Sequence, residues 1–331
     1  MPADALSGFT ESAFTHDGTT HRVFRAGSGP AVVVVHEAPG IHPGVVGFAR
    51  RLVDAGFTVV MPSLFGTPGR DVSIGYTAGA MARACVAREF TAFALDRTNS
   101  AMHWLRALAA DAHAECGGPG IGAVGMCFTG GFALGMMVGD DVLAPVLSQP
   151  SLPLGPGKRR NAAVGISDRD FTRLKERCAN ENISVLGLRF SEDRFVPRAR
   201  FETLQRELGD HFIWVDIDSR PGNPHGIKRS AHSVLTRDLV DEPGHPTRAA
   251  LDRALRTAPT RRLNCRHTDG LAVHTTLPST SSNRTTIRSP LAVGAVPAHA
   301  PWPSDTVRVP RSRVAPSPRT DSIVYVPVGS E

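Results

Sequence analysis

The stretch Ile121 to Gly135, I-G-A-V-G-M-C-F-T-G-G-F-A-L-G, decides the fold of this chain. Its first residues are small and apolar, which is typical of a strand buried on both faces. Gly125 and Gly130 flank the M-C-F triplet, and the residues from Phe132 onward have the pattern of a tightly packed helix. This order predicts a strand, a sharp turn and a helix, a geometry that holds a nucleophile in strained backbone at the edge of a sheet. The central residue of the turn is Cys127.

The pattern G-x-C-x-G-G favours Cys127 as a catalytic nucleophile, because an ionised thiol is a better nucleophile than a hydroxyl. The alternative is a small buried cysteine at a Gly-rich strand end, since free cysteine also behaves as a small apolar residue. The motifs elsewhere in the chain decide between the two.

Segments of strand and helix character alternate along the first 256 residues. This alternation predicts a doubly wound, mostly parallel α/β sheet with helices on both faces. An antiparallel hairpin turning at Asp17-Gly18 is expected to open it. The expected strands are 31–35, 57–61, 121–124, 142–147, 183–190 and 211–217; the expected helices are 45–55, 81–93, 100–114, 132 onward, 168–177, 198–208 and 246–256.

The net charge of +6 at pH 7 is concentrated at the C-terminal end of the chain. From Thr257 onward there are nine Arg, three Asp and one Glu, a net +5, which leaves +1 for the first 256 residues. A nearly neutral body does not predict a nucleic-acid partner. The same segment holds ten of the 26 prolines and has no sustained period. We therefore expect one α/β domain over 1–256 and a poorly ordered Arg/Pro/Ser/Thr-rich tail over 257–331.

The five cysteines are scattered and have no C-x-x-C spacing, which argues against disulfides and zinc and for a reducing cytoplasm. The N-terminus has no signal-peptide pattern, and no apolar run is long enough to span a membrane. His36 and His42 flank one loop without further ligands at metal spacing, so we interpret them as polar residues at the rim of the sheet rather than a metal site.

A cysteine nucleophile needs a base and a group that orients the base. Asp193, in S-E-D-R-F-V-P, follows an expected strand and is the candidate orienting carboxylate; its alternative role is that of a turn or helix-cap residue. The candidate bases are His225 and His232, and His232 is preferred because His225 lies in a Pro/Gly-rich turn. The order Cys, Asp, His along the chain is the one that α/β-hydrolases use.

The motifs G-M-C-F-T-G-G, V-H-E-A-P-G and S-E-D-R-F-V-P together resemble the dienelactone hydrolase family over roughly residues 15 to 256. The resemblance implies an α/β-hydrolase fold with a Cys-Asp-His triad, in which Cys127 is the nucleophile, His232 the base and Asp193 its orienter. It also implies that Glu37 restrains the resting thiol until substrate displaces the carboxylate. Such a carboxylate would raise the pKa of a neighbouring thiol, as expected for a like charge.

The resemblance further implies an oxyanion hole made by the backbone N–H groups of Phe128 and Ala38, and a substrate-binding arginine at Arg88. Arg83 is equally near in sequence. The segment before the histidine is longer than is usual in the family, and an arginine after it is not evident, although Arg237 is nearby.

The sequence therefore predicts a cofactor-free thiol hydrolase acting on a small ester or lactone, as a monomer or weak dimer in the cytoplasm. The alternative is a hydrolase-fold protein that binds a small molecule or a partner without catalysis. Retention of the nucleophile, base, orienter and Glu37 argues against that alternative, because a binding protein does not need all four.

Overall fold

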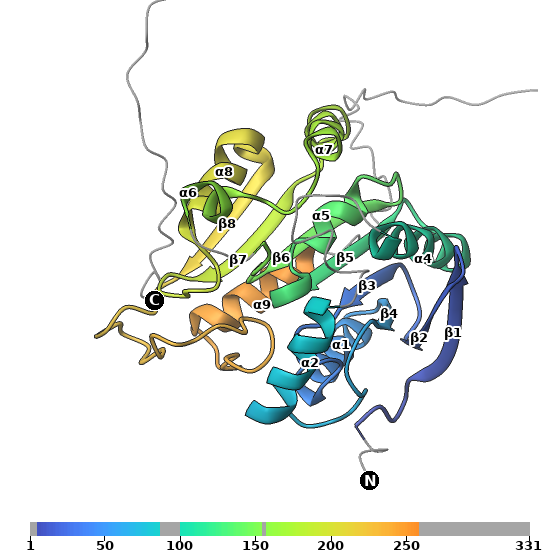
Figure 1. The fold of residues 1–331 in the computed structure, drawn as a ribbon, viewed down its shortest axis with the longest axis horizontal. Helices are drawn as coiled ribbons and strands as arrows, with labels where there is room; N and C mark the ends of the chain where they lie inside the picture. The colour runs from blue at the N-terminus through green and yellow to red at the C-terminus, as the bar shows by residue number, and fades with distance from the viewer. Residues whose placement is uncertain (1–4, 87–99, 154–156, 258–331) are drawn as a thin grey trace, which may run out of the picture. The chain divides into compact units, whose positions relative to one another are not determined.

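The computed structural model describes residues 5–86, 100–153 and 157–257, which all belong to one compact unit, Met1–Leu263. Its centre is an eight-stranded sheet with the order β1-β2-β4-β3-β5-β6-β7-β8 (Figure 1). β1 pairs antiparallel with β2, and β2 with β4, whereas every other pair of neighbours is parallel. The predicted mostly parallel sheet is confirmed.

The strands lie close to the segments expected from their apolar, β-branched runs. The opening hairpin turns at Asp17 and Gly18, with φ values of 47° and 73°, as a tight two-residue turn requires. The strands are β1 Thr10–His16, β2 Thr19–Ala26, β3 Ala31–Val35, β4 Thr58–Ser63, β5 Ile121–Met126, β6 Val142–Ser148, β7 Val185–Phe190 and β8 Phe212–Ile217.

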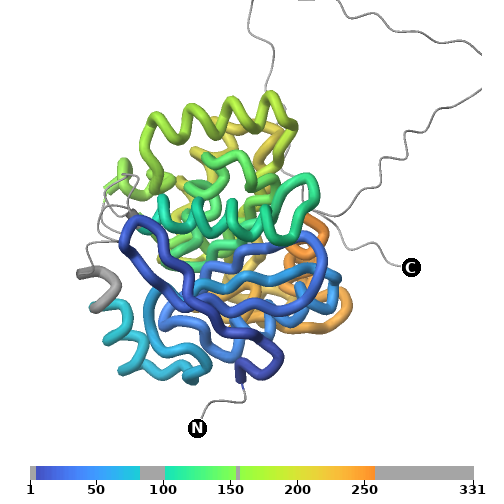
Figure 2. The backbone as a smooth tube through the Cα atoms, turned by 90° about the vertical axis from the view of Figure 1, so that its right-hand side faces the viewer, coloured from blue at the N-terminus to red at the C-terminus, as the bar shows by residue number. Residues whose placement is uncertain are grey.

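Helices cover both faces of the sheet, as predicted (Figures 1 and 2). Alternate residues of β3 point to opposite faces, so Val33 packs with one core cluster and Val34 with the other. The first cluster includes residues of α4, α5, α7 and α8, and the second includes residues of α1 and α9. The α-helices are α1 Pro43–Asp54, α2 Ile74–Val86, α4 Ser100–Cys116, α5 Phe132–Met137, α6 Lys158–Ala162, α7 Asp168–Glu181, α8 Arg198–Leu208 and α9 Pro246–Thr257; two 3-10 helices are η3 Cys127–Thr129 and η4 Gly209–His211.

The largest difference from the expected elements is at α2, which begins at Ile74 rather than at Met81. Glycines weaken the helical pattern of its first turns, but the Ser73 hydroxyl accepts a hydrogen bond from the Tyr76 N–H at 3.3 Å and caps the helix. The rest of the expected helix 81–93, beyond Val86, lies outside the described residues, as does the expected tail beyond Thr257.

Parallel strands bring their carboxyl ends to the same edge of a sheet. β3, β5, β7 and β8 all run parallel to one another, and each is followed by one candidate residue: Glu37, Cys127, Asp193 and His232, respectively. None of the described helices is long and apolar enough to cross a bilayer.

Candidate active site

Cys127 lies at the sharp turn between β5 and α5 and begins the short helix η3. Its φ of 54° is in the left-handed region, where a side chain costs about 1–3 kcal/mol and persists only if the surroundings enforce it. Gly125 permits this turn, since a Cβ there would lie 2.4 Å from the Thr129 carbonyl oxygen. The predicted strand, turn and helix are therefore confirmed, with a strained cysteine at the centre.

Two neighbouring segments enforce the turn. The Thr129 hydroxyl lies 2.9 Å from the Val35 carbonyl oxygen and accepts from the Met126 N–H at 3.2 Å, which joins the turn to the end of β3. That end leads to Ala38, whereas Phe128 is part of η3 itself. The two expected oxyanion-hole residues thus belong to segments that Thr129 ties together.

The second segment is the turn after β6. Ser151 donates its backbone N–H to the Cys127 carbonyl oxygen at 2.9 Å, and its hydroxyl donates to the Cys127 Sγ at 3.6 Å. Gly130 packs so closely on this turn that a Cβ would lie 2.4 Å from the Pro150 Cα. The thiol therefore has a buried hydroxyl beside it that sequence reasoning missed.

His232 follows β8 and pairs with Asp193, its Nδ1 lying 2.6 Å from the Asp193 Oδ2. Asp193 is buried, and its Oδ1 accepts the Phe195 N–H at 2.9 Å, so its carboxylate is fixed. Burial lowers the pKa of His232, but hydrogen bonds with Asp193 and with the Cys127 side chain outweigh burial and raise that pKa to about 11. The site thus favours the charged imidazole beside the sulfur.

The structure brings His232, and not His225, to the thiol and the carboxylate. His225 is exposed, and its ring contacts that of His245 with centroids 5.2 Å apart. The ring of Phe195, 59% exposed, contacts the His232 ring edge-on at 5.6 Å.

Residues 232–238 form what we call the base loop. The Asp238 Oδ2 accepts the backbone N–H groups of His232 and Ser233, both at 2.9 Å. Hydrogen bonds therefore hold the backbone of His232 as well as its side chain.

Glu37 is 1% exposed, and four side chains donate to its carboxylate. His42 Nε2 donates at 2.9 Å, the Ser233 hydroxyl at 2.9 Å and Gln149 Nε2 at 3.1 Å, and the Thr236 hydroxyl is the fourth donor. Burial raises the pKa of Glu37, but the hydrogen bonds from His42 and Thr236, together with the charges of His42 and His232, outweigh burial and lower that pKa overall. Among the hydrogen bonds of the described residues, none joins Glu37 to Cys127. Its predicted restraint of the thiol stays a prediction.

His36 and His42 lie beside Glu37 at the carboxyl edge of the sheet, and both are buried, at 0% and 2% exposure. His36 Nε2 accepts the Leu64 N–H at 3.1 Å, so its Nδ1 carries the proton and donates to the Glu37 carbonyl oxygen. His42 Nδ1 accepts the Gly44 N–H at 3.1 Å, so its Nε2 is the donor to Glu37. Neither belongs to a group of three His, Cys, Asp or Glu residues suited to a metal ion, and within the described ranges no such group occurs.

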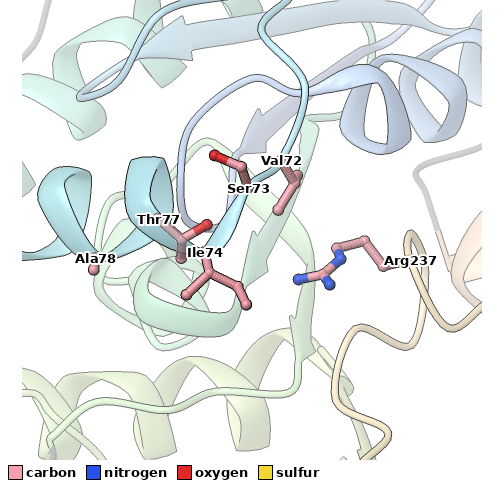
Figure 3. Close-up of a pocket in the computed structure, with 6 residues that line it drawn as sticks. All are labelled: Val72, Ser73, Ile74, Thr77, Ala78 and Arg237. Carbon is pink, nitrogen blue, oxygen red and sulfur yellow. The ribbon is translucent and has the colours of Figure 1, made fainter.

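Two arginines were expected to bind substrate. Arg88 lies outside the described residues, and Arg83 lies on α2. Arg237 lines a cavity of about 450 Å³ at the start of α2, opposite Val72 and Ile74 (Figure 3). Ser73, Thr77 and Ala78 complete its lining.

The functional residues that sequence reasoning missed are mostly hydroxyl and amide side chains: Thr129, Gln149, Ser151, Ser233, Thr236 and Asp238. A signal was present in H-S-V-L-T-R-D, where polar residues recur immediately after the candidate base. Glu37, the acceptor for Ser233 and Thr236, lies almost 200 residues earlier in the chain (196 from Ser233), so no local pattern could pair them.

Comparison with known proteins gives a family match and distant structural likenesses. Three solved structures illustrate the latter. A protein named m3DLH is 22% identical, covering 75% of this chain and 95% of that chain with a TM-score of 0.49. A dienelactone hydrolase-like promiscuous phosphotriesterase from metagenomic libraries is 18% identical, covering 76% and 98% with a TM-score of 0.49. A cold-adapted esterase from an Arctic intertidal metagenomic library is 15% identical, covering 76% and 94% with a TM-score of 0.46.

No curated protein matches the chain. The model of the dienelactone hydrolase family matches residues 22–249, a segment that contains every candidate residue for the chemistry. With its parallel sheet and its turn after β5, the chain belongs to the dienelactone hydrolase family and has the α/β-hydrolase fold.

Proposed function

We propose that this chain hydrolyses a carboxylic ester or lactone through a thioester formed on Cys127. Family membership supports an ester-cleaving hydrolase. The observation that carries the proposal is the strained Cys127 beside His232, whose imidazole is itself bound to Asp193 at 2.6 Å. Nucleophile, base and orienting group in this relation are what acyl transfer needs.

In the proposed reaction, the Cys127 sulfur attacks the carbonyl carbon and its proton resides on His232 Nε2. The tetrahedral intermediate then expels the alcohol, which takes that proton, and leaves an acyl thioester. Water next attacks the thioester and gives a proton to His232. Collapse of this second intermediate releases the acid and returns the proton to the thiol. Throughout the reaction the His232 Nδ1 keeps its proton and donates it in a hydrogen bond to the Asp193 carboxylate.

The developing oxyanion is proposed to bind the backbone N–H groups of Phe128 and Ala38. Removing one such donor costs about 10²–10³ in kcat in other acyl-transfer enzymes. The Ser151 hydroxyl, a donor to the sulfur, is suited to stabilise the thiolate between turnovers.

The substrate is proposed to be a small molecule, and Arg88 is proposed to bind a negatively charged group on it, with Arg83 as the alternative. Arg237 and the apolar wall of Val72 and Ile74 offer a second place for an acid with an apolar body. Comparing the hydrolysis of esters whose acid parts are neutral or negatively charged, in variants of each arginine, will show which arginine binds the substrate.

The test compares hydrolysis of a short-chain aryl ester and of a dienelactone by the parent, Cys127→Ala and the control Cys116→Ala. Cys116 lies at the end of α4 and takes no part in the proposed chemistry. We expect Cys127→Ala to lose at least about 10³-fold in kcat and Cys116→Ala to match the parent. Equal turnover by Cys127→Ala and the parent would contradict the proposal, and a folded parent without turnover on either compound would favour the non-catalytic alternative.

A further inference from the structure

The buried carboxylate of Glu37 joins three segments that are far apart in the sequence. It follows β3, and its four donors come from its own loop (His42), from the turn after β6 (Gln149) and from the base loop (Ser233 and Thr236). Two of the four donors thus lie on the loop that carries the base.

The residues that bind the base loop to Glu37 lie close to His232 in the sequence. Ser233 is the residue after His232, and its hydroxyl donates to the Glu37 Oε2 at 2.9 Å. Three residues later, the Thr236 hydroxyl donates to the Oε1. Between them, the Val234 N–H donates to the Gln149 Oε1 at 3.2 Å, and Gln149 in turn donates to Glu37.

The start of α1 also lies close to the base loop at this point. A Cβ on Gly44 would lie 3.3 Å from the Thr236 Cβ and 2.8 Å from the His42 Cε1, so only glycine fits without displacement. The polar anchor and the packing therefore locate the base loop together.

We propose that Glu37 is a positioning residue, which holds His232 at the Cys127 sulfur by binding the base loop through Ser233 and Thr236. This inference rests on the proposed function, because it assigns a support to the base of that reaction. It differs from the role implied by the family resemblance, in which Glu37 acts on the thiol and is displaced by substrate.

The energetics favour an anchor over a movable group. Hydrogen bonds to a charged acceptor are stronger than those between neutral groups, and a buried donor left without a partner is costly. Displacing Glu37 would break four such bonds in a site where the carboxylate is 1% exposed. A carboxylate so fully bound is suited to holding a loop in place.

The test distinguishes the positioning role from a direct action on the thiol. It uses two variants that disturb the link between Glu37 and the base loop in different ways. Glu37→Gln removes the charge, whereas the double variant Ser233→Ala/Thr236→Val keeps the charge and removes only its bonds to the base loop. The readout is the rate at which iodoacetamide alkylates Cys127 between pH 5 and 9, followed by mass spectrometry. Thr203→Val, which removes a hydroxyl bonded within α8, is the matched control.

We expect both Glu37→Gln and the double variant to alkylate roughly 10-fold more slowly than the parent at pH 7. Iodoacetamide reacts with the thiolate, and in both variants the imidazole that takes the thiol proton is no longer held at the sulfur. We also expect kcat for the ester to fall about 10²-fold with KM little changed, because misplacement of a catalytic group by about 1 Å has that effect.

Faster alkylation of Glu37→Gln than of the parent, or parent-like alkylation and turnover of the double variant, would overturn the inference. If Glu37→Gln does not fold, the double variant decides alone. The alkylation measurement needs no ester, so a parent that hydrolyses nothing but shows the expected alkylation pattern refutes the proposed function and leaves the positioning role supported.

Discussion

Replacing Asp193 tests how much the orientation and tautomer of His232 contribute to catalysis, because the imidazole itself stays in place. In Asp193→Asn, the amide can still accept the Phe195 N–H, but its NH₂ faces the His232 Nδ1 and favours the tautomer that carries the proton on Nε2. That tautomer cannot accept a proton from the thiol. We expect kcat to fall about 10²–10⁴-fold, measured by ester hydrolysis at pH 7.

The chain offers a matched control for this change. His113 and Asp141 form a second histidine–carboxylate pair, 2.7 Å apart, at the opposite end of the sheet just before β6. Asp141→Asn should therefore leave turnover unchanged. Similar losses in both variants would show that the effect of Asp193 comes from general stability rather than from the base.

We expect His36 to make the stability of the fold sensitive to acid. Burial lowers its pKa from 6.5 to about 4 in the folded chain. Between these two values the unfolded chain binds more protons, so stability is present at neutral pH and falls as the pH decreases from 6.5 to 4. A shift of this size corresponds to roughly 3 kcal/mol over that window.

We expect the free energy of unfolding in urea to fall more between pH 7 and pH 4.5 for the parent than for His36→Gln. The glutamine can replace both hydrogen bonds, to the Leu64 N–H and the Glu37 carbonyl oxygen, without titrating. Equal slopes for the two proteins would rule out His36 as the source of the acid sensitivity.

At the scale of elements, the turn after β5 depends on close contact between η3 and the turn after β6. Gly130→Ala would place a Cβ 2.4 Å from the Pro150 Cα, a backbone atom that cannot rotate away. We expect a loss of about 1–3 kcal/mol in the free energy of unfolding, the usual cost of overpacking, together with lower activity because Ser151 and Cys127 move apart.

Gly47→Ala is the control for this substitution. Gly47 lies within α1, where an added Cβ meets nothing within 4 Å. Alanine in a helix is favoured over glycine by about 0.5–1 kcal/mol, so this variant should match or exceed the parent in stability. A comparable loss in both variants would indicate that the contact with Pro150 is not the cause.

At the scale of the whole molecule, the compact unit Met1–Leu263 contains the complete sheet and every described candidate residue. A chain ended after Leu263 should therefore fold and keep the ester hydrolysis of the full chain, with the same melting temperature within a few degrees. If the shortened protein aggregates or loses turnover while the full chain is active, the proposed domain boundary near residue 256 is wrong.

Local sequence patterns determine several of the strands and turns of this protein. The β-branched run at 31–35, the Asp17-Gly18 turn and the Gly-rich stretch around Cys127 specify their own structures, because strand burial, hairpin turns and strained turns depend on neighbouring residues. Alternation of these segments then implies the sheet, and the sheet implies that the candidate residues meet at one edge.

The partner of each polar group depends on how distant segments come together in the folded chain. Glu37 and Ser233 are 196 residues apart, and their hydrogen bond exists because β3 and β8 end at the same edge of the sheet. The pairing of His232 with Asp193 and the burial of His36 and His42 have the same origin. A residue's type fixes which bonds it can form, whereas burial by distant segments determines which bonds it must form, since a polar group removed from water needs a partner.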